Sequence, residues 1–443
     1  MAARLSNSVA PQHPGPLSRE GRKTQRGTPE TTPPTKARPH RDGSRPPPTI
    51  ESADACPPRL PLTAPVAAAA SPALRAIGWP FAGAPDDPAW AAALAAHPTA
   101  RPARVIEQHR SGYVVAEAID RQQPAESPPE WLRRRFPAQD RAAVGDWVLI
   151  EGGNAPATAA HRARIVAMLP RRSAIKRAAA GEHYHQQVIA ANIDTVLVVC
   201  GLDADFNPRR IERYLLLVRG TGADAPEAVV VLTKSDLAGA EAEAASLAAL
   251  DGLRAQGMVA VAVNAKDLAS VDALAPWLQA GRTAVLVGSS GAGKSTLTNT
   301  LLGVEKMKTG AVRESDARGR HTTTFRSLIA LPSGACLIDT PGMRELKPTG
   351  EEDLADGGFA DIEALAADCK FRDCRHAKEP GCAVRAAIDA GALDRGRFAN
   401  YLKLRDEVAG AAHQLANRLA QKTDAKVAGK AFHKRLDEKY GKH

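Results

Sequence analysis

A glycine-rich turn that ends in a lysine and a serine is the part of this sequence best suited to chemistry. The backbone N–H groups of such a turn, and the start of the helix after it, attract phosphate oxygens. Lys294 would reach the β- and γ-phosphates of a nucleotide, and the Ser295 hydroxyl would bind Mg²⁺. The alternative is a turn without a ligand. The expected contacts come from Gly288, Ser289, Ser290, Gly291, Ala292, Gly293, Lys294, Ser295 and Thr296.

A second motif could read the base of that nucleotide. Thr233, Lys234, Ser235 and Asp236 follow the apolar run 228–232, at the carboxyl end of a predicted buried strand. Asp236 could accept hydrogen bonds from N1–H and the exocyclic amine of guanine, a donor pair that adenine lacks. The same four residues can also occur as an ordinary surface string. Downstream, Asn264 and Ala265 follow the predicted strand 259–263 and could support the base.

A third motif would bind the metal and sense the terminal phosphate. Asp339, Thr340, Pro341 and Gly342 follow the apolar run 335–338. Asp339 would hold Mg²⁺ through water, and the Gly342 N–H would contact the γ-phosphate. Thr323, in the polar stretch 319–324, could complete the Mg²⁺ coordination, although that stretch also fits an ordinary solvated loop.

The order of these motifs is unusual. In an ordinary GTPase the guanine-reading motif follows the phosphate loop, whereas here it precedes the loop. The sequence therefore predicts a circularly permuted GTPase. Met343 stands where Ras-like GTPases carry the glutamine that orients the attacking water, so we expect slow intrinsic hydrolysis. His321, beside Thr323, is the best candidate in this chain for that catalytic task, and the alternative is a surface histidine without a role.

A cluster near the C-terminus has the chemistry of a metal site. Three thiolates and one imidazole suffice for a closed, structural Zn²⁺ centre. A disulfide with bystanders, or buried free thiols, would also fit the spacing. The four residues are Cys369, Cys374, His376 and Cys382.

The elements that must position these residues can be read from apolar runs. Near-continuous apolar runs between residues 185 and 348 predict parallel strands buried on both faces, with helices at 208–218 and 240–250. Short strand-like runs between 100 and 175 predict a small β-barrel. The arginines 133–135, beside Trp131 and Phe136, could form a nucleic-acid face, or the aromatic rings could instead belong to the barrel core.

The ends of the chain differ from its middle. Residues 1–98 are rich in Pro, Ala, Ser and Arg, and we predict a disordered tail. The lysines 422, 426, 430 and 434 would share one helix face, which favours an RNA contact over a solvated tail.

Composition narrows the partners and the compartment. The chain has 443 residues, a net charge of +10 and six cysteines. A basic surface favours a polyanionic partner. The sequence contains no apolar run long enough for a membrane helix, and the cysteine pattern differs from a disulfide framework. We expect a cytoplasmic monomer without a membrane partner.

Together the motifs resemble the ribosome small subunit-dependent GTPase A family (RsgA, also called YjeQ). The resemblance covers roughly residues 100–410 and includes 194–199, 319–324, 339–345 and the Cys/His cluster. It implies an OB-fold, one structural Zn²⁺, GTP or GDP with Mg²⁺, and binding to the small ribosomal subunit and its rRNA late in maturation. The expected regions are a tail (1–98), an OB-fold barrel (99–180), a permuted α/β P-loop GTPase domain (181–348) and a helical zinc-binding domain with a basic tail (349–443).

Three other functions remain open from the sequence. If the protein is a P-loop ATPase or kinase, the resemblance of residues 233–236 to a guanine-reading motif is a coincidence. An RNA-binding assembly factor could use nucleotide only to set its affinity. A permuted GTPase of the large subunit is disfavoured by the Cys/His cluster and the barrel.

Overall fold

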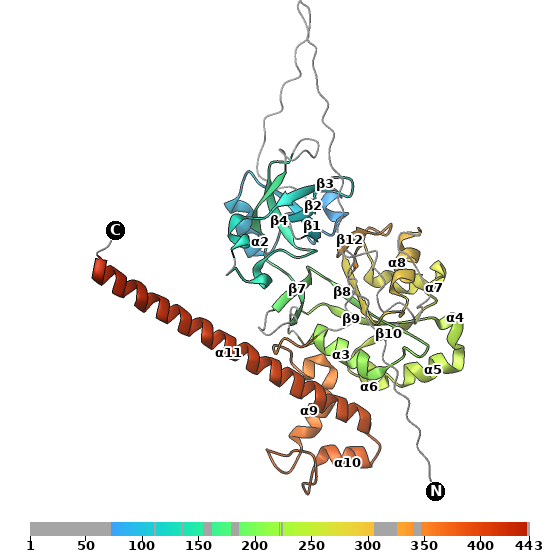
Figure 1. The fold of residues 1–443 in the computed structure, drawn as a ribbon. Helices are drawn as coiled ribbons and strands as arrows, with labels where there is room; N and C mark the ends of the chain where they lie inside the picture. Colours follow the sequence, from blue (N-terminus) through green and yellow to red (C-terminus); the bar gives the residue numbers. More distant parts are fainter. Residues whose placement is uncertain are drawn as a thin grey trace, which may run out of the picture. The chain divides into compact units, whose positions relative to one another are not determined.

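The computed structural model describes residues 72–109, 112–133, 136–153, 162–178, 186–220, 222, 225–304, 326–339 and 347–440 (Figure 1). Its strands are β1 (Arg101–His109), β2 (Gly112–Ala116), β3 (Gln122–Glu126), β4 (Trp147–Glu151), β5 (Ala163–Met168), β6 (Ala174–Ala178), β7 (Gln186–Ala191), β8 (Thr195–Gly201), β9 (Glu227–Thr233), β10 (Val259–Ala262), β11 (Thr283–Gly288), β12 (Ser327–Ala330) and β13 (Cys336–Asp339).

Helices lie between and after these strands. The α-helices are α1 (Pro72–Arg75), α2 (Pro88–Ala96), α3 (Pro208–Arg219), α4 (Ser235–Ala238), α5 (Ala240–Ala248), α6 (Asp251–Arg254), α7 (Leu268–Val271), α8 (Lys294–Leu302), α9 (Ala360–Ala367), α10 (Ala383–Asp389) and α11 (Arg395–Tyr440). Shorter helical turns are η1 (Pro129–Leu132), η2 (Ala138–Asp140), η4 (Asp272–Trp277) and η5 (Ala355–Phe359).

Strands β1 to β5 close into a barrel. Strand β1 pairs with both β2 and β4, β2 pairs with β3, and β5 lies between β3 and β4. Every pairing is antiparallel except that of β3 with β5. This five-stranded arrangement matches the predicted OB-fold. Strand β3 escaped the sequence prediction because Gln122, Gln123 and Glu126 break any apolar pattern.

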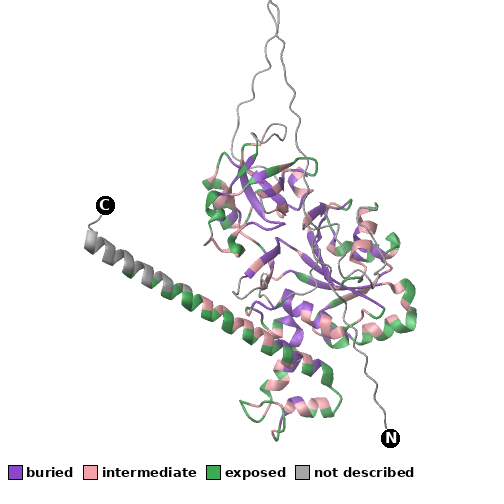
Figure 2. Ribbon diagram, viewed as in Figure 1, coloured by how far each residue is buried: buried purple, intermediate pink, exposed green. Residues whose placement is uncertain are grey.

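The central sheet has the order β10-β9-β8-β11-β13-β12. All of its pairings are parallel except that of β12 with β13. Alternate residues of β8 enter two different apolar clusters: Val196 and Val198 pack in one, Leu197 and Val199 in the other. Buried residues therefore line β8, β9, β11 and β13 on both faces, as the continuous apolar runs predicted (Figure 2). The edge strand β10 differs from that prediction, because its four residues are exposed or only partly buried.

Two helices cover opposite faces of this sheet. Helix α3 contributes Ile211 and Leu215 to one cluster, whereas α8 contributes Leu297 to the other. Helix α3 begins sharply because the Asn207 side chain accepts hydrogen bonds from the N–H groups of Arg209 and Arg210. The observed helices α3 and α5 agree with the predicted helices 208–218 and 240–250.

The predicted disordered tail was wrong for residues 72–98. Helices α1 and α2 lie in this segment, and Trp79 and Trp90 are buried. The Trp79 ring meets Trp90 and Trp147 edge-on, with centroid distances of 5.3 and 4.8 Å. Three aromatic side chains therefore supply an apolar contact that the Pro- and Ala-rich composition concealed. The rest of the predicted tail, residues 1–71, lies outside the described residues.

A buried arginine joins this segment to the barrel and the sheet. Arg104 of β1 is fully buried and donates to the carbonyl oxygens of Ile77, Gly145 and Asn192, at 2.7, 3.2 and 3.1 Å. Its guanidinium also lies over the Trp147 ring. Burial lowers the pKa of Arg104, while the nearby Cys336, Asp194 and Asp146 act in the opposite direction. Since its partners come from three parts of the chain, Arg104 fixes their mutual register.

The C-terminal helices have a small core of their own, and helix α3 enters it. Phe359, Ile362, Phe398 and Leu404 pack together with Leu216 of α3. Polar contacts surround this apolar joint. Arg397 of α11 binds the buried Glu212, and Arg213 binds Glu407.

Candidate nucleotide and metal sites

The phosphate loop connects β11 to α8, as the sequence predicted. Gly288, Gly291 and Gly293 all have positive φ angles, of 145°, 81° and 91°. A Cβ at Gly288 would lie 2.1 Å from the Val199 carbonyl oxygen. The loop therefore requires glycine for its conformation and for close contact with the neighbouring strand β8.

The lysine predicted to bind phosphate lies against this loop. Lys294 is the first residue of α8, and its Nζ donates to the carbonyl oxygens of Gly288 and Ser289. These contacts hold the cation at the start of α8, where helix geometry already favours an anion. The arrangement can therefore receive nucleotide phosphates.

The residues predicted to read guanine are hydrogen-bonded to the phosphate loop. Thr233 ends β9, is fully buried, and donates from Oγ1 to the Ala292 carbonyl oxygen at 2.6 Å. Lys234 has a left-handed backbone conformation with φ of 64°, which turns the chain after the strand. Asp236 Oδ2 lies 3.4 Å from Lys266 Nζ. The two predicted motifs, distant in sequence, thus form one continuous site.

The predicted base support joins the same site through α8. The Ala265 carbonyl oxygen accepts a hydrogen bond from Thr300 Oγ1 of α8 at 2.6 Å. The Asn264 side chain accepts from the Lys266 N–H, and its own N–H donates to Ser270 Oγ. The Asn264–Ala265 turn is therefore fixed by contacts on both sides.

The structure describes only part of the predicted Mg²⁺ and switch residues. Asp339 ends β13 and is buried, and β13 pairs with β11, the strand that leads into the phosphate loop. Ser295 lies in the first turn of α8. A carboxylate at the end of β13 and a hydroxyl in the first turn of α8 are oxygen ligands of the kind Mg²⁺ prefers. Thr323, His321, Gly342 and Met343 lie outside the described residues.

The sequence analysis missed an acidic loop beside these motifs. Asp203 and Asp205 follow β8, and Asp203 pairs with Lys234 at 2.6 Å. Asp205 accepts a hydrogen bond from Ser289 Oγ in the phosphate loop. Burial works against the charged form of Asp203, but the hydrogen bonds from Lys234 and from the Asp205 N–H, together with the Lys234 charge, outweigh it and lower the pKa of Asp203. This loop could have been predicted from two acidic residues at the carboxyl end of a central strand, where ligands bind in open α/β sheets.

The Cys/His cluster assembles as predicted. The ligand atoms of Cys369, Cys374, His376 and Cys382 all lie within 4.8 Å of one another. Both Cys369 Sγ and Cys382 Sγ lie 3.5 Å from His376 Nδ1, and the two sulfurs are 3.9 Å apart. Ligands placed tetrahedrally around zinc would be about 3.5–3.8 Å apart. The four side chains therefore fit one Zn²⁺, and the 3.9 Å separation excludes a disulfide between Cys369 and Cys382.

The predicted aromatic nucleic-acid face is not formed by the described residues. Trp131 is buried in the barrel core, where its ring meets Tyr113 edge-on. Phe136 packs against the same core. These rings therefore serve the barrel core, which was the other reading that the sequence allowed. Arg133 is exposed, whereas Arg134 and Arg135 lie outside the described residues.

No helix among the described residues is long and apolar enough to cross a membrane.

The strand order and the placement of the phosphate loop, of residues 233–236 and of Asp339 define a circularly permuted P-loop GTPase. The sheet places β8, β9 and β10 on one side of β11, with β13 and β12 on the other, although β8 to β10 come first in the chain. The profile of the RsgA GTPase family matches residues 168–349. The chain belongs to the RsgA GTPase family.

Curated relatives agree with this assignment, and a solved structure shares the fold. The Small ribosomal subunit biogenesis GTPase RsgA of Xanthomonas campestris pv. campestris (strain B100) is 69% identical over 357 residues, which cover 81% of this chain and 94% of the relative. The protein of the same name from Xanthomonas axonopodis pv. citri is 68% identical over 359 residues, 81% of this chain and 95% of the relative. The crystal structure of YjeQ from Thermotoga maritima shares the fold, with a TM-score of 0.50, 22% identity, and coverage of 70% of this chain and 99% of that one.

Proposed function

We propose that this protein binds the small ribosomal subunit late in its maturation and hydrolyses GTP to GDP and phosphate, with turnover stimulated by the subunit. The structural observation that carries the GTPase part is the bond between Thr233 Oγ1 and the Ala292 carbonyl, which joins the base-reading and phosphate-binding loops. The relatives named small ribosomal subunit biogenesis GTPase supply the partner. A cytoplasmic, monomeric protein fits this role.

In this proposal each loop has a separate task. Asp236 recognises guanine, and Asn264 and Ala265 support the base. Residues 288–296 bind the phosphates, with Lys294 as the principal cation. Gly342 senses the γ-phosphate. Ser295, Thr323 and, through water, Asp339 would hold Mg²⁺, which neutralises charge on the β- and γ-phosphates.

The attacking water needs a group that orients it. Met343 lacks such a group, and we propose that His321 supplies it once the subunit has bound. His321→Ala is expected to abolish subunit-stimulated turnover while leaving the affinity for GTP unchanged. An equal loss of GTP affinity would exclude the catalytic role.

The barrel and the C-terminal region would contact rRNA. The chain carries a net charge of +10, and phosphate contacts by lysine and arginine release counterions. Helix α11 continues through the predicted lysine stripe at 422, 426, 430 and 434. The Zn²⁺ would be structural, since four protein ligands leave no open coordination position.

The direct test is GTP turnover by the purified protein, alone and with small ribosomal subunits. Large subunits and ATP serve as controls. We expect slow turnover alone and strong stimulation by the small subunit only. Hydrolysis of ATP in preference to GTP would overturn the guanine assignment. Turnover that never rises with the subunit would leave an RNA-binding factor whose nucleotide only sets its affinity.

A further inference from the structure

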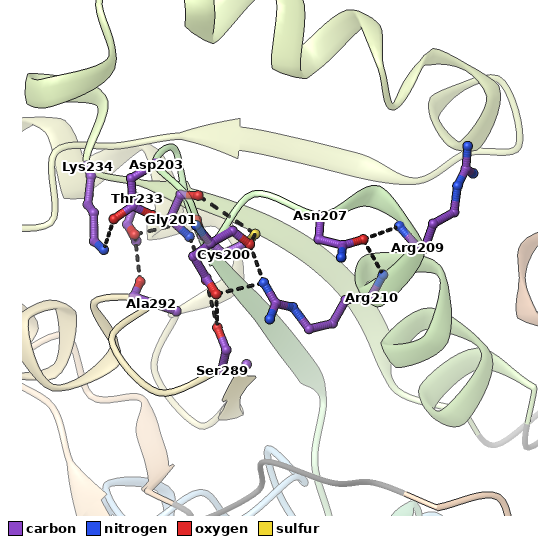
Figure 3. Close-up of polar contacts among 12 residues, drawn as sticks. Cys200, Gly201, Asp203, Asn207, Arg209, Arg210, Thr233, Lys234, Ser289 and Ala292 are labelled. Atoms are coloured by element: carbon purple, nitrogen blue, oxygen red, sulfur yellow. Dashed lines mark hydrogen bonds and ion pairs between the residues drawn. The ribbon is translucent and has the colours of Figure 1, made fainter. Parts of the chain in front are cut away.

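The loop between β8 and α3, residues 202–207, contacts both halves of the nucleotide site (Figure 3). Asp203 pairs with Lys234 on the base-reading side. On the phosphate side, both carboxylate oxygens of Asp205 lie 2.6 Å from Ser289 Oγ. Ser289 is the second residue of the phosphate loop, so Asp205 holds that loop by a side chain rather than through the backbone.

Asp205 is itself firmly held. Its Oδ1 accepts from Arg210 Nη2 at 2.6 Å, and its Oδ2 accepts from the Gly201 N–H at 3.2 Å. Its side chain is 15% exposed. Arg210 lies in the first turn of α3, which the Asn207 cap fixes in place. Because these contacts converge on one carboxylate, Asp205 offers Ser289 an acceptor in a fixed position.

The charge balance also favours a role in nucleotide binding. A carboxylate beside a phosphate loop would repel phosphate if it were unpaired. Arg210 balances that charge, so Asp205 can order the loop without opposing the ligand. Hydrogen bonds to charged groups are stronger than neutral ones, which suits a contact that must order a glycine-rich segment.

We infer that Asp205 is a positioning residue of the nucleotide site, which orders the phosphate loop for the β-phosphate through Ser289. The inference rests on the proposed binding of guanine nucleotide at this loop. A loop ordered before binding loses less entropy when the nucleotide arrives, so affinity rises without a new contact to the ligand. GDP and GTP should depend on Asp205 equally, since both carry the β-phosphate.

A double-mutant cycle tests this inference through the dissociation constant for fluorescent GDP. Asp205→Ala and Ser289→Ala are each expected to raise that constant about tenfold, the equivalent of one lost charge-assisted hydrogen bond. The double variant should be no weaker than either single variant, because both changes remove the same contact. Ser289→Thr keeps a hydroxyl and is expected to restore affinity.

Asp203→Ala is the matched control, since it lies in the same loop but pairs with Lys234. Its effect should add to that of Ser289→Ala. Additive effects of Asp205→Ala and Ser289→Ala, or lower thermal stability with unchanged GDP affinity, would overturn the inference and leave the proposed function standing. Failure of the wild-type protein to bind any guanine nucleotide would refute both.

Discussion

Replacing Arg397 by methionine tests the joint between α3 and the C-terminal helices. The Arg397 side chain is 8% exposed, and its guanidinium donates to Glu212, Asp361 and the Gly358 carbonyl oxygen. It also lies 5.0 Å from the centroid of the Phe359 ring. Methionine keeps an unbranched apolar stem, although it is shorter than arginine, and it removes the charge and every donor.

The expected loss of stability follows from what remains around Glu212. Breaking a buried ion pair by removing one partner typically costs 3–5 kcal/mol. Glu212 retains contacts from Arg209 and Asn400, so its charge is not left wholly unpaired. We therefore expect the lower end of that range, about 3 kcal/mol. The matched control is Arg213→Met, whose pair with Glu407 has side chains 28% and 31% exposed and should contribute about 1 kcal/mol or less.

Urea unfolding followed by three signals separates the joint from the rest of the protein. The five tryptophans are Trp79, Trp90, Trp131, Trp147 and Trp277, all before the phosphate loop, so their fluorescence reports on the barrel and the sheet. Zinc release reports on the C-terminal region. Helical circular dichroism reports on all helices, of which α11, with 46 residues, is the longest among those described. Arg397→Met should lower the urea midpoint of the circular dichroism and zinc-release transitions by roughly 1–3 M. A shift no larger than that of Arg213→Met would refute this account of the joint.

Three further perturbations follow from the structure. In Gly293→Ala the added Cβ would lie 3.0 Å from Thr233 Oγ1 at a φ of 91°, so GDP affinity should fall about tenfold or more, and unchanged affinity by titration would contradict this. Cys382→Ser should lose the bound Zn²⁺, measured by metal analysis of the purified protein, and retention of one equivalent would argue against the four-ligand site. Trp79→Ala should destabilise the protein by about 3–5 kcal/mol in urea unfolding, and a change below about 1 kcal/mol would show that the ring cluster contributes little.

The central sheet could be predicted because parallel strands buried on both faces leave continuous apolar runs, as in β9. The hairpin of β6 and β7 could not, since Lys176, Arg177, Gln186 and Gln187 interrupt its pattern. The folded N-terminal segment was missed for a related reason. Its composition resembles that of a disordered tail. An isolated ring such as Trp79 stabilises the fold only through contact with Trp147, which is distant in the sequence.

Within the candidate site, contiguous motifs were predictable and isolated contacts were not. Residues 288–295 can be recognised in the sequence because a phosphate loop needs glycines at fixed spacing. Asp205 belongs to no such pattern, and it lies 84 residues from its partner Ser289. Only the parallel pairing of β8 with β11 brings the two together. Similarly, no local pattern in α3 predicts the ion pair between Glu212 and Arg397.

The joint on α3 also sets an order of events during synthesis. Glu212 and Arg397 are 185 residues apart, which a ribosome adds in roughly 10–40 s. Throughout that interval the face of α3 that contains Leu216 is not covered by the C-terminal helices. The strands that precede the proposed base-reading residues emerge before the phosphate loop, so the proposed nucleotide could stabilise the new domain only after β11 and α8 have been made. A chain truncated after β13 would contain every strand of the sheet and still expose this apolar face, which makes such a fragment prone to aggregation.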